Sequence, residues 1–191
     1  MNRREAIKRT AMVLGYAVSV PALAGILNGC KTAPELTYTP VFFTQEQASL
    51  ISEVAEIILP KTDTPGAKDV GVPGFIDQML KDVYPQKDKD RFMKGLAEFE
   101  DDAKKTYGDS FALCEPEQQL ELVKRYHDVA IAGVKDKTIK ERPFILMTKE
   151  LTMLGFFTSE PGATQVLQYA PVPGAYHGCL PLAEVGKTWA T

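Results

Sequence analysis

Histidine and cysteine are scarce in this 191-residue chain, which holds two His and three Cys. The sequence also has no glycine-rich phosphate-binding loop, no Gly-x-Ser-x-Gly motif, no Cys-x-x-Cys-His and no histidine pair at metal-binding spacing. The sequence therefore carries none of these motifs for nucleotide-dependent, hydrolytic, haem or zinc chemistry. We expect no catalytic residue, no cofactor-binding residue and no metal ligand in this chain.

Clustered positive charge is missing as well. The formal net charge is −3, but residues 1–29 hold four of the 22 Lys and Arg and one of the 25 Asp and Glu. The chain without these residues carries about −6 by the same count. Nucleic-acid binding depends on Lys and Arg gathered to neutralise phosphates. We therefore expect no nucleic-acid partner.

Residues 1–29 are predicted to be an export signal. Arg3 and Arg4 lie in a short cationic stretch, and an uncharged apolar run follows over residues 11–27. The arginine pair, with Ile7 and Lys8, favours a twin-arginine signal. The general secretory route remains open, because Ala6 stands where a phenylalanine is usual in twin-arginine signals.

The end of the signal predicts a lipid anchor. Leu27-Asn28-Gly29-Cys30 resembles a lipobox, in which the nucleophilic Cys sulfur is acylated and the chain is cut before it. Residues 30–42, with two prolines and no helical periodicity, would form the anchor and a tether. This predicts a lipid-anchored protein on the periplasmic side of a bacterial membrane. The alternatives are a soluble form cleaved after Ala24 and an uncleaved membrane anchor.

Residues 43–191 are predicted to form a single all-α domain of five to six helices with an irregular Pro- and Gly-rich C-terminal tail. A capping box from Thr44 to Gln47 opens the first helix, and prolines stand at the start of several others. No alternating stretch is long enough to require a strand. Helices are expected over residues 45–59, 73–83, 87–105, 116–130, 143–154 and 163–169.

Cys114 and Cys179 remain once Cys30 is assigned to lipid. In an oxidising compartment this even pair suggests a disulfide, and two separate thiols are the alternative, because the sequence does not give their separation. Of the two histidines, His127 is predicted to face the core, whereas His177 lies in the tail and is the better functional candidate. A stand-alone enzyme would use His177 with a carboxylate such as Asp77 or Glu160.

Three longer stretches are more specific than this general pattern. The first is Leu59-Pro60-Lys61-Thr62-Asp63-Thr64-Pro65-Gly66-Ala67 with Gly71-Val72-Pro73-Gly74-Phe75-Ile76-Asp77, the second covers residues 151–164, and the third covers residues 169–179. All three resemble the gluconate 2-dehydrogenase subunit 3 family, the small subunits of membrane-associated flavoprotein dehydrogenases. We refer to them as the first, second and third blocks.

The resemblance implies a non-catalytic subunit that binds a large subunit. In that family the large subunit carries FAD and oxidises a sugar or sugar acid, and electrons pass to a cytochrome c subunit or another acceptor. The small subunit's signal is thought to carry the folded partner across the membrane. FAD is therefore expected in the partner and no cofactor in this chain.

Aromatic and proline-rich residues of the second and third blocks are the candidates for the partner interface, because rigid aromatic side chains often anchor binding surfaces. Phe156 suits the domain's own core equally well. The alternative function is a stand-alone periplasmic envelope or solute-binding lipoprotein. The candidate interface residues are Phe156, Phe157, Tyr169, Pro171, Val172, Pro173, Tyr176 and His177.

Overall fold

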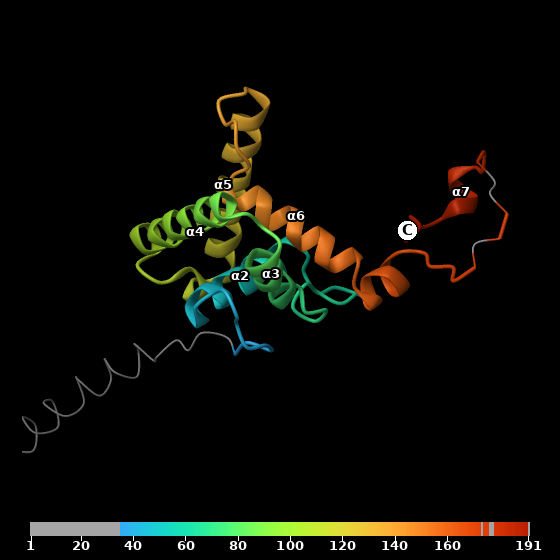
Figure 1. Ribbon diagram of the computed structural model, residues 1–191, viewed down its shortest axis with the longest axis horizontal. Coiled ribbons are helices and arrows are strands. Elements are labelled where there is room, and N and C mark those ends of the chain that lie inside the picture. The colour runs from blue at the N-terminus through green and yellow to red at the C-terminus, as the bar shows by residue number, and fades with distance from the viewer. Residues whose placement is uncertain (1–34, 173, 176–177, 191) are drawn as a thin grey trace, which may run out of the picture. The chain divides into compact units, whose positions relative to one another are not determined.

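The computed structural model describes residues 35–172, 174–175 and 178–190 (Figure 1). Arg3, Arg4 and Cys30 lie outside these residues, as do Pro173, Tyr176 and His177. Within the described part the regular structure is helical, which confirms the predicted all-α fold. No strand occurs there, and the bridge between Gln168 and Trp189 is isolated.

The helices lie close to the predicted ranges. In chain order they are α2 Gln45–Ile58, α3 Val72–Asp82, α4 Gln86–Tyr107, the 3-10 helix η1 Phe111–Leu113, α5 Pro116–Lys135, α6 Phe144–Phe157, the π-helix η2 Gly162–Val166 and α7 Leu182–Val185.

Local chemistry sets several helix ends. The Thr44 hydroxyl accepts a hydrogen bond from the Gln47 amide, and the Gln47 side chain accepts one from the Thr44 amide, so the predicted capping box is confirmed. Pro116 opens α5, where its missing amide hydrogen has no cost. Gly108 ends α4 in the left-handed conformation, with φ 83°.

Helix α6 is the centre of the domain. It packs against α2, α3, α4 and α5 (Figure 1). A helix that is apolar on most of its circumference is typical of a buried position. The buried residues of α6 are Phe144, Ile145, Leu146, Met147, Thr148, Leu151, Thr152, Gly155 and Phe156.

Aromatic side chains fill the space between α4 and α6. The rings of Phe92 and Phe144 meet edge to face with centroids 5.0 Å apart, a favourable geometry for aromatic pairs. Phe99 packs in the same way on Phe111, at 4.8 Å. Phe111 belongs to η1, so this short helix, which was not predicted, supplies a fully buried core residue.

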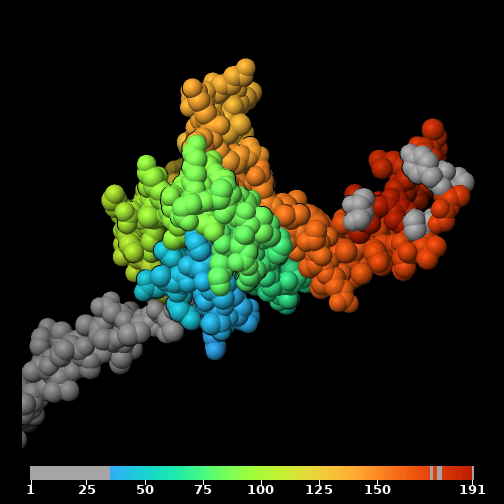
Figure 2. All heavy atoms as spheres, viewed as in Figure 1, coloured from blue at the N-terminus to red at the C-terminus, as the bar shows by residue number. Residues whose placement is uncertain are grey.

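The predicted tether is partly docked on the domain. Leu36, Tyr38 and Phe42 pack against the core, and Figure 2 shows the blue atoms of this segment lying against the green atoms of the α3 and α4 region. The contacts of the domain therefore begin before the predicted boundary at residue 43.

The helix predicted over residues 163–169 was wrong in type and length. A π-helical turn occupies Gly162–Val166, closed by a hydrogen bond from the Leu167 amide to the Gly162 carbonyl, and Leu167 is extended. The Thr164 hydroxyl donates to the Glu160 carbonyl. Such side-chain bonds compete with the regular helical ladder.

Candidate functional site

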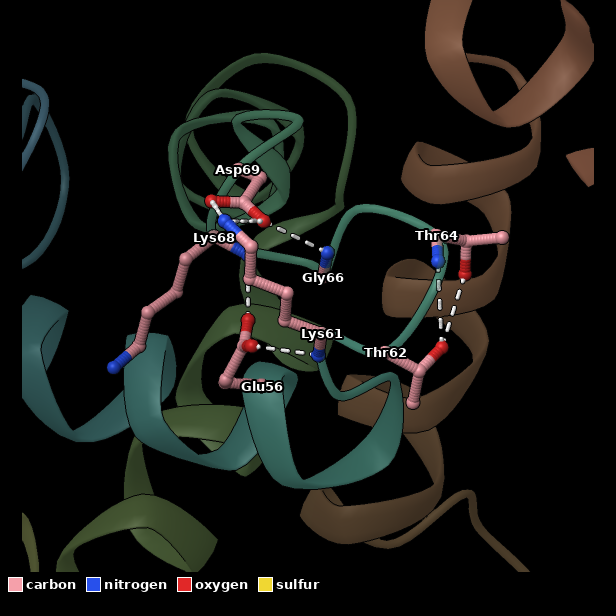
Figure 3. A network of polar contacts seen from close by, with 7 residues as sticks. All are labelled: Glu56, Lys61, Thr62, Thr64, Gly66, Lys68 and Asp69. Carbon is pink, nitrogen blue, oxygen red and sulfur yellow. Dashed lines mark hydrogen bonds and ion pairs between the residues drawn. The ribbon is translucent and has the colours of Figure 1, made fainter. Parts of the chain in front are cut away.

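The loop between α2 and α3, which carries the first block, is held by two carboxylates (Figure 3). Glu56, in the last turn of α2, accepts hydrogen bonds from the amides of Lys61 at 3.0 Å and Lys68 at 2.9 Å. Asp69 accepts from the Gly66 amide at 3.0 Å and pairs with the Lys61 ammonium at 3.1 Å. Loop amides that would otherwise lack partners are thereby bonded within the chain.

Gly66 and Asp69 show why these residue types stand here. A Cβ atom at Gly66 would lie 2.3 Å from a carboxylate oxygen of Glu56, so only glycine lets the carboxylate reach the loop. The Gly66 amide, followed by the hydrogen bond from Lys61, holds the pKa of the Asp69 carboxyl below its ordinary value. No pattern in the sequence singled out Asp69, so its structural role was missed.

The tip of this loop is preorganised but takes no part in the core. The Thr62 amide donates to the Thr64 carbonyl at 3.0 Å, and the Thr64 amide donates to the Thr62 hydroxyl at 3.5 Å. Thr62 and Asp63 are exposed. Figures 1 and 3 both show the loop beside the C-terminal part of α6. The first block thus reaches the second block with an exposed polar tip.

A close helix contact joins the first and second blocks. Gly155 of α6 faces Phe75 of α3, and a Cβ atom at Gly155 would lie 2.6 Å from the Phe75 ring. The absence of a side chain at Gly155 therefore lets α3 and α6 approach. These two motif residues are explained by packing alone.

The outer face of α6 in the second block is apolar and exposed. Leu154 is 47% exposed and Met153 38%, whereas Leu151 of the same helix is buried. Phe157 is half-buried. Its ring meets that of Phe156 edge to face, with centroids 5.2 Å apart.

The candidate interface residues of the second block divide between core and surface. Phe156 is 3% exposed and belongs to the core. The sequence left open whether Phe156 belongs to the domain's own core or to the partner interface. Its burial favours the core. Phe157 keeps part of its surface accessible and stays a candidate for the interface.

The third block lies in a C-terminal segment, residues 167–190. None of its described residues is among the buried or partly buried apolar residues that form the core and its margin. Tyr169 is 56% exposed and Val172 85%, and Pro171 is exposed. Main-chain hydrogen bonds of Gln168 with Thr188 and Ala190, at 2.8 and 2.9 Å, join the two ends of the segment.

The buried carboxylate of Asp77 is already committed to the main chain. It is 1% exposed and accepts three amide hydrogen bonds from residues 41–43. This contradicts its use as the acid or base partner of His177 in a stand-alone enzyme. The signal that could have revealed this role is an acid within the apolar stripe of α3, one residue after Ile76 and three before Leu80.

The two cysteines considered for a disulfide have different environments. Cys114 is buried after η1, and its Sγ lies 3.4 Å from the Ser110 carbonyl. Cys179 is exposed in the C-terminal segment. The structure shows no bridge between them, and pairing in the exported protein stays a prediction for thiol titration.

His127 is partly exposed rather than buried, which corrects its predicted place in the core. Its Nε2 lies 3.0 Å from the Lys149 ammonium and its Nδ1 3.3 Å from the Asp128 carboxylate.

A hollow of about 620 Å³ lies between α4 and α5. Its charged rim includes the ion pair of Arg125 with Asp102, at 2.6 Å.

The described residues form neither a membrane-spanning helix nor a metal-binding cluster. None of their helices is long and apolar enough to span a membrane. They also contain no group of three or more His, Cys, Asp or Glu side chains arranged to hold a metal ion.

Comparison with family models decides the family. The model described as gluconate 2-dehydrogenase subunit 3 matches residues 45–174. The chain belongs to this family. The match runs from the start of α2 to Gly174, so the subunit 3 region contains the first two blocks and the beginning of the third. Neither the search of curated proteins nor that of solved structures gave a match.

Proposed function

We propose that this chain is a non-catalytic small subunit that binds the FAD-containing large subunit of a sugar or sugar-acid dehydrogenase. Membership of the subunit 3 family is the observation that carries the proposal. Electrons would leave the flavoprotein toward a cytochrome c subunit or another acceptor, without passing through this chain. The acids Glu56, Asp69 and Asp77 hold the main chain in place, and this supports a structural use of the carboxylates in and next to the first block.

The proposed docking surface consists of exposed and half-exposed residues in the second and third blocks. Their apolar side chains remain partly or largely exposed, and burial of that surface against a partner would stabilise the complex by roughly 25 cal/mol per Å². Large exposed apolar side chains gathered in one region often mark an interaction site. The docking surface is Met153, Leu154, Phe157, Tyr169, Pro171 and Val172.

Substitution on this surface tests the docking proposal. Tagged chains carrying Leu154→Asp or Tyr169→Asp should recover the large subunit from solubilised membranes at least about tenfold less well, because a charge would be buried in the interface. Val129→Asp is the matched control, since Val129 is 64% exposed on α5. Equal recovery with all three variants would contradict the docking surface.

We also propose that the chain assists export of its partner and attaches it to the membrane. The arginine pair Arg3-Arg4 and the lipobox ending at Cys30 support this part. Replacing Arg3 and Arg4 by lysine should leave the dehydrogenase activity in the cytoplasm. Replacing Cys30 by serine should release the activity from the membrane into the soluble periplasmic fraction. Unchanged location in both variants would contradict the proposal.

The alternative of a solute-binding lipoprotein has one observation in its favour, the hollow between α4 and α5. Its volume of about 620 Å³ lies within the range of small-molecule sites. A solute that raises the melting temperature of the isolated protein, in the absence of any partner, would favour this alternative.

A further inference from the structure

One side chain of α3 binds the main chain of the segment that precedes α2. The Asp77 carboxylate accepts hydrogen bonds from the amides of Val41 at 2.6 Å, Phe42 at 3.1 Å and Phe43 at 2.8 Å. Asp77 is buried, and among the described residues no Lys or Arg forms an ion pair with its carboxylate. Hydrogen bonds to a buried charged acceptor are strong and costly to lose. Asp77 therefore clamps the C-terminal end of a segment, residues 36–43, which we call the strap.

Apolar contacts hold the strap along its length. The Tyr38 ring packs over Gly74 of α3. Phe42 and Phe43 meet edge to face at 5.3 Å, and the Phe43 ring lies 5.9 Å from that of Phe92 in α4. The strap is thus fixed to both α3 and α4, as the adjoining blue and green atoms of Figure 2 show.

Docking of the strap changes the number of residues between the proposed lipid and the first residue that contacts the domain. Leu36 follows Cys30 by six residues and Phe43 follows it by thirteen. An extended chain covers at most about 3.5 Å per residue, so the reach is about 21 Å to Leu36 and about 45 Å to Phe43. While the strap is bound, the shorter reach applies.

We propose that the clamped strap holds the α3 and α4 side of the domain next to the headgroups of a phospholipid bilayer. Because α3 also packs on α6 through Phe75 and Gly155, the clamp would set the height at which the docking surface presents the large subunit. The proposal rests on the lipid attachment at Cys30 proposed above. The short length of chain between Cys30 and Leu36 identifies the bilayer surface as the partner. The proposal requires no particular lipid chemistry.

The clamp itself is tested by amide hydrogen exchange on the full chain. In Asp77→Asn, exchange at Val41, Phe42 and Phe43 should speed up by about tenfold to a hundredfold, because an amide group replaces the charged acceptor. Asp82→Asn is the matched control, since it removes an exposed carboxylate from the same helix. Unchanged exchange in Asp77→Asn would overturn the clamp.

The distance between the domain and the headgroups is tested by neutron reflectometry. The sample is the lipidated chain on a supported bilayer of phosphatidylethanolamine and phosphatidylglycerol. The wild-type domain should begin within about 21 Å of the headgroups. Six Gly and Ser residues inserted between Glu35 and Leu36 keep the clamp but lengthen the tether, and should widen the gap by roughly 5–20 Å.

Two results would overturn the height claim. One is a gap that the insertion leaves unchanged. The other is a full chain that does not bind the bilayer, which would also contradict the lipid attachment in the proposed function. Amide exchange would then still decide whether Asp77 clamps the strap, so the two proposals fail separately.

Discussion

The first and third blocks both carry motif residues of the family, but their surroundings in the domain differ. In the loop after α2, Glu56 and Asp69 bond the loop amides, and Gly66 makes room for Glu56. In the C-terminal segment, Tyr169 and Val172 are exposed and do not belong to the core. A motif explained by internal contacts reveals the fold, whereas a motif whose large apolar side chains stay exposed points to a partner outside the chain.

The largest effect on stability is expected where the second block enters the core. Leu151→Ala should lower the free energy of unfolding by about 2–5 kcal/mol, because it leaves a cavity at a buried position. Leu154→Ala, on the exposed face of the same helix, should change it by less than about 1 kcal/mol. Urea unfolding measures both, and equal losses would mean that the two faces of α6 are not distinct.

A smaller loss is expected in the first block. Glu56→Ala should cost about 1–3 kcal/mol, since it removes the acceptor for two loop amides. Asp63→Ala, at the exposed tip, should stay within about 0.5 kcal/mol. If urea unfolding gives the two variants the same stability, the loop does not depend on Glu56.

A pH-dependent effect follows from Asp69. The Gly66 amide and then Lys61 lower its pKa in the folded protein, so its stabilising contribution is complete above the unfolded pKa of about 4 and is lost as the pH falls through the lower folded value. The urea midpoint of the wild type should exceed that of Asp69→Asn at pH 6. The difference should shrink toward pH 3, and a constant difference would contradict the assignment.

The smallest effect on stability is expected from removing the C-terminal segment. Truncation after Leu167 should change the free energy of unfolding by less than about 0.5 kcal/mol, because no described residue from 168 to 190 belongs to the hydrophobic core. The same truncation should prevent recovery of the large subunit from solubilised membranes. A marked loss of stability would show that the segment belongs to the domain's own fold.

Local signals in the sequence were enough to place the main helices. The capping box at Thr44, the helix-opening Pro116 and the spacing of apolar residues act within one or two turns. The 3-10 helix at Phe111 was missed because it depends on packing against Phe99. The π-helical turn after Pro161 was missed because Gly162 lies directly against the Phe156 carbonyl there, a contact that no apolar spacing reveals.

The site was less predictable than the helices, because it is built from long-range contacts. Asp77 binds residues 34 to 36 positions earlier, and no local pattern reveals such a pairing. Phe156 and Phe157 are adjacent in sequence, yet only the position of α6 in the core decides that the first is buried and the second half-exposed. The family motifs marked the blocks to consider but did not separate structural residues from exposed ones.

The central claim is that this subunit acts through a flavoprotein partner. The direct test is affinity purification of the tagged full chain from detergent-solubilised membranes of the native host, followed by the flavin absorbance spectrum and a sugar-oxidation assay. The account predicts that a larger FAD-containing polypeptide co-purifies in fixed ratio and carries the activity. Recovery of the chain without a flavoprotein, or sugar oxidation by the chain alone, would contradict it.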